Sequence, residues 1–162
     1  MNTAYLILGG NIGDMRLNLS TALVMLNEKA GVITKKSEIF MTSPWGNTDQ
    51  PEFFNQAVCI ETHLGPHKLL DQLLSIEEKL GRKRTEKKWQ ERTMDIDILF
   101  FNTEIIEEPH LKIPHPHIQE RRFVLKPLAE IAFDLEHPVF KKNVGMLLSE
   151  CKDECSVKVV SY

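Results

Sequence analysis

The residues with the clearest capacity for chemistry are Asp95 and Asp97, in a stretch from Met94 to Phe101 that is rich in branched and aromatic side chains. Such a composition predicts a β-strand. Side chains at positions i and i+2 of a strand share a face, so the two carboxylates leave it together, roughly 6–7 Å apart at Cα. Mg²⁺ binds such oxygen ligands and keeps positions open for phosphate. Taken alone, an Asp-x-Asp pair is explained more simply by a solvated strand face.

The run immediately before this strand changes the balance. From Arg82 to Arg92, six of eleven residues are basic, in a chain whose formal net charge is −3. The run has no apolar period, and it contains Trp89. We expect a loop whose cations neutralise phosphate oxygens beside a carboxylate pair that holds Mg²⁺, the arrangement that phosphoryl transfer requires. A polybasic targeting signal is the alternative, and the interleaved glutamates weaken it.

A second group of polar residues follows the strand. The prolines of Pro109–His117 predict a rigid, extended loop in which His115 is a directed hydrogen-bond donor suited to a phosphate. Arg121 and Phe123 come next, in a short helix that we expect to be interrupted at Pro127. His115 and His117 also suggest zinc, but no third ligand stands at helical spacing.

The strand predicted over residues 53–62 carries Phe53 and Asn55 on one face, and we assign the core to the other face. A flat ring beside an amide with both donor and acceptor groups suits a planar heterocycle that needs stacking and edge hydrogen bonds. A simple core role for Phe53 is equally consistent. The preceding segment, Thr42–Pro51, contains two prolines and a glycine and predicts a long irregular loop.

Several regular elements must position these groups. We predict a strand over Thr3–Leu8, a helix capped by Asp14 and ending near Gly31, a strand over Val32–Met41, a helix from Pro66 to Gly81, a hairpin through Asn102–Thr103 to Ile106, a helix over Val144–Cys151 and a strand over Val157–Val160. Strand alternation places Phe100 with Ile96 and Ile98. Glu77 lies off the leucine stripe of its helix, and we expect it to be solvated unless a partner lies beside it. The Gly9–Gly13 segment matches neither glycine-rich phosphate motif and predicts a turn.

Composition limits the class of protein. The 162 residues fit a single domain, 1–162, and the acidic balance argues against a general nucleic-acid binder. Three cysteines are too few for a disulfide framework, and neither a secretion signal nor a bilayer-length apolar run is visible. We therefore expect a cytoplasmic enzyme with reduced thiols, acting as a monomer on small molecules, without nucleic-acid or membrane partners.

With these motifs in place, the chain resembles the 6-hydroxymethyl-7,8-dihydropterin pyrophosphokinase family, over Ala4 to about Pro138. Residues 91–99, Glu-Arg-Thr-Met-Asp-Ile-Asp-Ile-Leu, are the most specific part. Further support comes from Gly9–Gly13, from Asp49–Asn55 and from Ile113–His115. The resemblance implies transfer of pyrophosphate from ATP to a pterin alcohol with release of AMP, in folate synthesis. We accordingly predict an α+β domain with a ferredoxin-like, mostly antiparallel sheet covered by helices.

The resemblance also implies roles for individual residues. Asp95 and Asp97 would bind two Mg²⁺ ions that bridge the ATP phosphates. The catalytic cations would be Arg82, Arg92, Arg121 and His115. Contacts to ATP would come from Glu77, Arg84, Trp89, Arg92, Ile98, His115 and Arg121. The pterin would lie between Phe53 and Phe123, with Asn55 on its edge and Thr42, Ser43 and Trp45 around it.

The chain departs from the family pattern at Gln90, where glycine is usual, and at Pro116, where an aromatic hydroxyl is common. Two rival functions remain open from the sequence. An RNA-binding module would also use exposed aromatics on a ferredoxin-like sheet, although no RNP-like run is present. A nucleotidyl transferase could use the same carboxylate pair, but it would attach AMP and not release it.

Overall fold

The computed structural model describes residues 1–42, 51–81 and 94–160. Its elements in chain order are β1 (Asn2–Gly10), α1 (Met15–Lys29), β2 (Val32–Lys36), β3 (Phe40–Thr42), β4 (Phe53–Thr62), α2 (Pro66–Lys79), β5 (Asp95–Phe101), β6 (Ile106–Glu107), β7 (Lys112–Ile113), a 3₁₀ turn (Ile118–Glu120), α3 (Arg122–Ala132), α4 (Val144–Glu150) and β8 (Val157–Val159). Asp14 caps α1 as predicted, because its Oδ1 accepts the Leu17 N–H at 3.1 Å.

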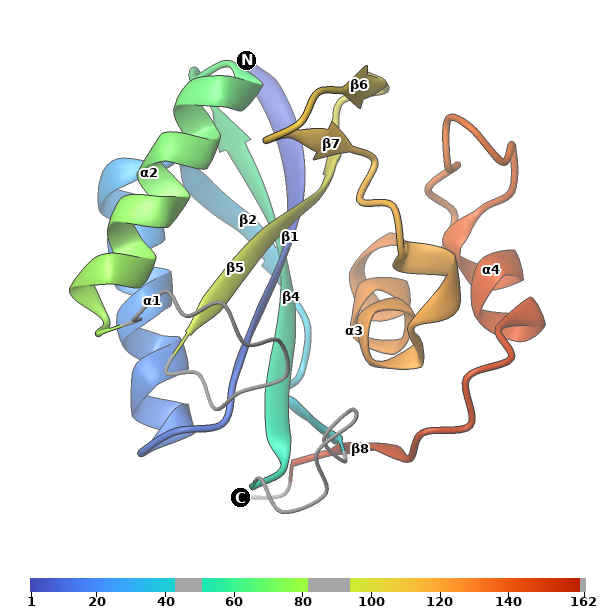
Figure 1. Ribbon diagram of the computed structural model, residues 1–162, viewed down its shortest axis with the longest axis horizontal. Coiled ribbons are helices and arrows are strands. Elements are labelled where there is room, and N and C mark those ends of the chain that lie inside the picture. The colour runs from blue at the N-terminus through green and yellow to red at the C-terminus, as the bar shows by residue number, and fades with distance from the viewer. Residues whose placement is uncertain (43–50, 82–93, 161–162) are drawn as a thin grey trace.

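The main sheet has the strand order β5-β1-β4-β3-β8, and β2 pairs with β4. Each pairing between the described strands is antiparallel. Helices α1 and α2 cover one face of this sheet, while α3 and α4 lie on the other (Figure 1). The predicted α+β class is therefore confirmed, and the order of strands and helices from β1 to β5 is ferredoxin-like. Within the described segments, no helix has the length and apolarity needed to span a bilayer.

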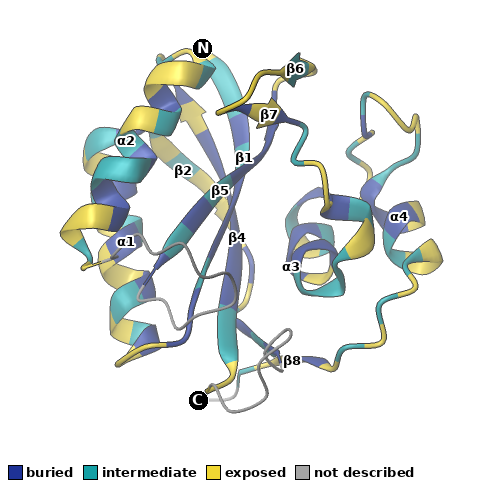
Figure 2. Cartoon of the chain, in the orientation of Figure 1, coloured by how far each residue is buried: buried dark blue, intermediate teal, exposed yellow. Residues whose placement is uncertain are grey.

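Two hydrophobic clusters, one on each face of the sheet, hold the layers together (Figure 2). Leu6 of β1 and Val58 of β4 pack under α1 and α2. Their neighbours Ile7 and Ala57 point the other way, into the cluster with α3 and α4. The prediction that the Phe53–Asn55 face of β4 is open is wrong over most of its length, because α3 buries Ala57 there. That face stays less covered only near Phe53.

A β-bulge in β5 overturns the predicted faces of its last residues. Leu6 pairs with Ile98, but Tyr5 pairs with Phe100, so Leu99 is an extra residue in the ladder. Leu99 and Phe100 therefore both enter the α3 cluster, whereas Phe101 enters the α1–α2 cluster with Ile98. Strict alternation had placed Phe100 with Ile98, and the bulge is the reason that this is wrong.

Local competition for hydrogen bonds explains two other differences from the sequence prediction. The strand expected over residues 32–41 is divided at Ser37, whose Oγ accepts the Ala57 N–H at 2.9 Å in place of a regular ladder bond. The predicted hairpin through Asn102 is also wrong. Strand β6 pairs with β7 and not with β5, and Asn102 bonds instead to β1: its Oδ1 accepts the Thr3 N–H at 2.9 Å, and its own N–H donates to the Thr3 carbonyl oxygen at 2.8 Å.

Helix α3 is not interrupted at Pro127, contrary to the prediction. Proline removes one backbone hydrogen bond in a helix interior, at a typical cost of about 3 kcal/mol. Pro127 is buried, and so are Val124 and Leu128, which pack in the second cluster. The apolar face of α3 offsets the lost bond, so the helix continues to Ala132.

His137 organises the turn that joins α3 to α4. Its ring is buried, lies 5.5 Å from the Phe100 ring and accepts the backbone N–H groups of Val139 and Phe140 at Nδ1, both at 3.2 Å. These two bonds require an unprotonated Nδ1. Burial lowers the pKa of His137 below its usual 6.5.

The turn should consequently weaken in acid. A histidine whose folded pKa is lowered binds more protons when unfolded, so its contribution to stability is complete above the unfolded pKa, about 6.5, and falls as the pH drops towards the folded value. We expect the free energy of unfolding in urea to decrease from pH 7 to pH 5, with a smaller decrease in His137→Gln. An equal pH dependence in the two proteins would contradict this role.

Candidate active site

The two aspartates stand at the start of β5, on the face of the sheet that α3 also covers. Asp95 pairs with Gly9 of β1, and Asp97 pairs with Ile7. Directly opposed residues in an antiparallel ladder point to the same face, so both carboxylates lie on the side of Ile7. Both aspartates are half-buried. The alternation predicted from the sequence therefore holds in this part of the strand, ahead of the bulge.

Glu77 anchors β5 from helix α2. A partner does lie beside it, which is the case that the sequence prediction left open: Glu77 is 3% exposed, and its Oε2 accepts the Ile96 N–H at 2.6 Å. Ile96 stands between the two aspartates on the edge strand of the sheet, where a backbone donor has no neighbouring strand to receive it. The buried carboxylate supplies this acceptor and fixes the backbone that carries both aspartates.

His115 is attached to the same edge by the bulge. Its backbone N–H donates to the carbonyl oxygen of Leu99 at 3.0 Å. Because Leu99 is the extra residue of the bulge, the distortion that redirects Phe100 also creates the attachment point for the loop after β7. The sequence predicted a rigid loop for His115, and the structure shows what holds it beside the aspartates.

The ring of His115 is set up as a neutral donor. Its Nδ1 accepts the backbone N–H of His117 at 3.1 Å, so in the neutral ring the proton must reside on Nε2. The pKa of His115 is lowered to about 4, chiefly by burial and then by the charges of Arg121 and His117, while the charge of Asp95 opposes them. At neutral pH the Nε2–H group can donate to an anionic ligand without adding charge.

An NMR titration can check this assignment. We expect the His115 ring to titrate near pH 4, well below the 6.5 of a free histidine. Arg121→Ala should raise the pKa, because it removes a cation, and Asp95→Asn should lower it further, because it removes an anion. Shifts in the opposite directions would show that these charges do not act on the ring. His67→Gln, which changes an exposed histidine on α2, is the control and should leave the pKa of His115 unchanged.

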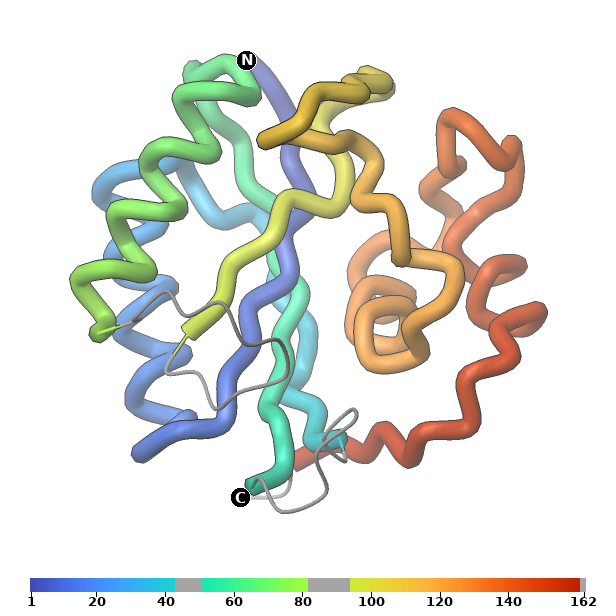
Figure 3. Tube along the Cα trace, viewed as in Figure 1, coloured from blue at the N-terminus to red at the C-terminus, as the bar shows by residue number. Residues whose placement is uncertain are grey.

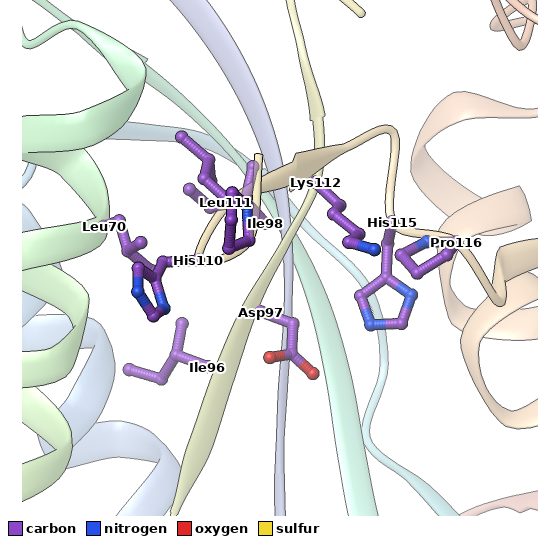
Figure 4. Close-up of a pocket in the computed structure, with 10 residues that line it drawn as sticks. Leu70, Ile96, Asp97, Ile98, His110, Leu111, Lys112, His115 and Pro116 are labelled. Atoms are coloured by element: carbon purple, nitrogen blue, oxygen red, sulfur yellow. The ribbon is translucent and has the colours of Figure 1, made fainter. Parts of the chain in front are cut away.

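A cleft of about 220 Å³ lies beside β5. It is lined by Leu70, Ile96, Asp97, Ile98, Pro109, His110, Leu111, Lys112, His115 and Pro116. Figure 4 shows Leu70, Ile96 and His110 towards one end, and Asp97, Lys112 and His115 towards the other. The cleft thus combines an apolar end with an end that carries both signs of charge.

The family resemblance implies that Asp97, Ile98 and His115 lie near the nucleotide, and these three line the cleft together. Lys112 was not predicted. The signal was present, because Lys112 lies between Leu111 and Ile113, both of which are buried. A short strand with this alternation directs the middle side chain away from the core and, in this fold, into the cleft.

A row of residues connects the aspartates to the predicted pterin side. Asp95 of β5 pairs with Gly9 of β1, which pairs with Asn55 of β4. Asn55 is buried, and its Nδ2 has no hydrogen-bond partner in the described structure. A Cβ on Gly9 would stand 2.3 Å from Asn55 Oδ1. Sequence analysis missed this role of Gly9, because its place before other glycines indicated only a turn.

The remaining predicted pterin contacts surround Asn55. Phe53 is half-buried two residues earlier on the same face of β4, and it pairs with the buried Thr42 of β3. Phe123 lies near the start of α3, partly buried against the second cluster. The guanidinium of Arg121 is 5.8 Å from the centre of the Phe123 ring. These residues therefore come from β3, β4 and α3, the two layers that meet at this face.

Several predicted contacts lie outside the described residues. They are Ser43, Trp45, Arg82, Arg84, Trp89 and Arg92. Gln90, where the chain departs from the family pattern, also lies outside the described residues.

The residues around β5 fit magnesium better than zinc. Residues 1–42, 51–81 and 94–160 contain no group of three or more His, Cys, Asp or Glu side chains placed to hold a metal ion. Structural zinc needs four such ligands, whereas Mg²⁺ uses one or two carboxylates with water and phosphate oxygens. His115 already uses Nδ1 within its loop, and His117 pairs with Glu120 at 2.9 Å. The paired aspartates thus suit a magnesium site that a phosphate ligand completes.

Comparison with known proteins identifies the relatives of this arrangement. Residues 5–133 match the profile of the family described as 7,8-dihydro-6-hydroxymethylpterin-pyrophosphokinase (HPPK). The chain belongs to the HPPK family. It is 49% identical over 136 residues to 2-amino-4-hydroxy-6-hydroxymethyldihydropteridine pyrophosphokinase of Bacillus subtilis, covering 83% of this chain and 81% of that one. The Pseudomonas aeruginosa protein of the same name is 38% identical over 151 residues, covering 93% and 92%.

HPPK membership confirms the family predicted from the sequence and its reaction, pyrophosphoryl transfer to hydroxymethyldihydropterin in folate biosynthesis. A solved Plasmodium falciparum HPPK-DHPS structure supports the ferredoxin-like fold, with a TM-score of 0.78 at 20% identity. This likeness covers 92% of the present chain and 45% of the Plasmodium chain, so the present HPPK chain spans less than half of that protein.

Proposed function

We propose that this chain transfers pyrophosphate from ATP to the hydroxymethyl group of 6-hydroxymethyl-7,8-dihydropterin at the site around β5. The pterin hydroxyl oxygen bonds to the β-phosphorus of ATP and loses its proton to water, the bond from that phosphorus to the bridging oxygen of the α-phosphate breaks, and AMP leaves with that oxygen. The observation that carries the proposal is the row from Asp95 through Gly9 to Asn55, which links a carboxylate pair at the cleft to a buried amide whose Nδ2 has no partner among the described residues.

Asp95 and Asp97 would hold Mg²⁺, in two ions by the family resemblance. Bound there, the metal would neutralise charge on the phosphate oxygens. The backbone that carries the carboxylates is held before substrate arrives. Glu77 accepts the Ile96 N–H between the two aspartates, and Asp95 and Asp97 are both paired with β1. Preorganisation of this kind avoids the cost of arranging charged groups during the reaction.

In this proposal the nucleotide binds in the cleft beside β5. Its apolar end, with Leu70 and Ile96, suits a purine base, and its charged end, with Lys112 and His115, suits phosphate oxygens. The Nε2–H of the neutral His115 ring would donate a hydrogen bond to the triphosphate, and Arg121 would add a cation near it. Arg82, Arg84, Trp89 and Arg92 complete the nucleotide contacts in this proposal.

The pterin would bind on the sheet side of α3. Asn55 Nδ2 lacks a partner within the described structure, and a heterocycle with carbonyl and ring-nitrogen acceptors would supply one. Phe53 and Phe123 offer aromatic faces from opposite layers, and Thr42, Ser43 and Trp45 complete the pocket in this proposal. The hydroxymethyl group would then point towards the aspartates along the row through Gly9.

We further infer that the chain is a monomer that works in the cytoplasm, where the three free cysteines would stay reduced. Light scattering coupled to size-exclusion chromatography tests the monomer directly.

The function is tested by incubating the chain with ATP, Mg²⁺ and the pterin alcohol and separating the nucleotides by chromatography. We expect AMP and the pterin diphosphate in equal amounts, no AMP without the pterin, and loss of turnover in EDTA that excess Mg²⁺ restores. Formation of ADP, or attachment of AMP to the pterin, would contradict the proposal. Salt-sensitive RNA binding without Mg²⁺, in a chain that does not turn over ATP, would favour the RNA-binding alternative.

A further inference from the structure

The segment after α4 runs back across the start of α3 and ends on the sheet. Residues 151–156 follow α4, and β8 then pairs with β3, with Val157 opposite Thr42 (Figure 3). We call residues 151–160 the C-terminal strap. It lies beyond residue 133, where the match to the HPPK profile ends. Sequence analysis assigned no chemistry to it.

The strap supplies the cap of α3. The residue at the N-cap position, Arg121, makes no side-chain capping bond to the helix. Instead, Arg122 donates twice to Asp153: its backbone N–H to Oδ2 at 3.1 Å and its side-chain Nε to the carbonyl oxygen at 2.9 Å. The first of these bonds satisfies a backbone donor that the first helical turn leaves without an intrahelical partner. The carboxylate also lies at the positive end of the helix dipole.

The capped turn is the one that carries substrate residues. Arg121 and Phe123 flank Arg122, and the charge of Arg121 acts on His115 across the site. The strap is itself held in shape, because Asp153 Oδ1 accepts the Cys155 N–H at 2.9 Å. At its far end, Lys126 of α3 donates to the Val157 carbonyl oxygen at 3.3 Å, beside the ladder to Thr42. The strap therefore joins α3 to β3, the two walls of the pterin side.

We propose that Asp153 is a positioning residue for pyrophosphoryl transfer, which holds the first turn of α3 so that Arg121 and Phe123 meet the substrates in register. The inference rests on the proposed function of the site. Asp153 would contact neither substrate and would act through Arg122. Displacement of substrate-positioning groups by about 1 Å can lower rates by about 100-fold. If Asp153 has this role, its replacement should lower kcat/KM by a larger factor than it lowers the fraction of folded protein.

The test compares Asp153→Ala and Asp153→Asn with Asn143→Ala. Asn143 caps α4, accepting the Met146 N–H at 2.8 Å, so its replacement removes a helix cap of similar kind at a helix that carries no predicted substrate residue. We expect Asp153→Ala to lower kcat/KM about 10- to 100-fold. Asp153→Asn should recover most of it, since its amide oxygen still accepts an N–H. Asn143→Ala should have the kcat/KM of the wild type. All kinetics are measured at temperatures where every variant is folded.

Hydrogen exchange provides a second readout that does not depend on turnover. Asp153→Ala should speed exchange at the Arg122 amide by at least tenfold, and Asn143→Ala should not. Faster exchange with unchanged kcat/KM would overturn the positioning role, and so would an equal kinetic loss in Asn143→Ala. A wild-type chain without pterin-dependent AMP formation would refute the proposed function. Unchanged exchange in Asp153→Ala would independently refute the cap.

Discussion

Replacing Asp97 by asparagine is expected to lower kcat for pterin-dependent AMP formation by about 10³-fold, the scale seen when a preorganised electrostatic group is removed from a reacting site. Asp97 lines the cleft and shares a strand face with Asp95. Asparagine keeps the shape of the side chain and one oxygen, but it removes the negative charge that a divalent cation needs. The remaining activity should require more Mg²⁺, so a magnesium titration of kcat should move to higher concentration.

The same change should affect the fold less than the reaction. Asparagine keeps the size of the side chain and one of its oxygens, so the free energy of unfolding is expected to change less than the activation free energy does. Asp71→Asn is a suitable control, because Asp71 is exposed on α2 and should alter neither quantity. An Asp97→Asn enzyme with kcat within about threefold of the wild type would refute the metal assignment. A large loss of stability would assign Asp97 to folding and not to the reaction.

The sequence predicted those features that depend on local periodicity. The strand face shared by Asp95 and Asp97 follows from alternation over three residues, which the ladder to Ile7 and Gly9 preserves. The cap at Asp14 and the helix start at Pro66 depend on bonds or torsions within one turn. These predictions are correct because each is decided within a few residues of the chain.

Features that depend on distant segments could not be predicted. The bulge at Leu99 is set by register against β1 and by the bond from His115, sixteen residues later in the chain. Glu77 is buried because Ile96 offers it an unpaired N–H, although helical periodicity places this residue off the apolar stripe. Both are positions where a partner from another element decides the environment. Both also lie next to the aspartates, where local rules commonly yield to function.

At Gly9, a local pattern and a contact with a distant segment both favour glycine. A glycine at the end of a strand, followed by another glycine, indicates a turn, and no local rule distinguishes a glycine needed for its torsions from one needed for its lack of a side chain. Gly9 lies inside the β1 ladder, between Asp95 and Asn55. It is the close approach of Asn55, and not the turn, that excludes a side chain here. This distinction leads to a direct test.

Gly9→Ala is expected to raise KM for the pterin about 10- to 100-fold, the equivalent of one lost or misdirected buried hydrogen bond. The new Cβ would stand 2.3 Å from Asn55 Oδ1 and 3.3 Å from the Phe54 carbonyl oxygen. Because the carbonyl belongs to the paired backbone of β4, the Asn55 amide must move. Overpacking of this kind typically costs about 1–3 kcal/mol of unfolding free energy. KM for ATP should change less, since the cleft beside β5 does not include Asn55.

Gly65→Ala is the matched control, because a Cβ on Gly65 has no heavy atom within 4 Å and the backbone there has a negative φ of −74°. As a glycine at the N-cap of α2, it should cost less than about 1 kcal/mol and leave both KM values unchanged. A second variant separates fit from stability: Gly9→Ala combined with Asn55→Ala removes the clashing amide. The double variant should recover unfolding free energy relative to Gly9→Ala while keeping the high KM for the pterin. Recovery of the wild-type KM in the double variant would show that Asn55 does not contact the pterin, and that the row from Asp95 through Gly9 serves packing alone.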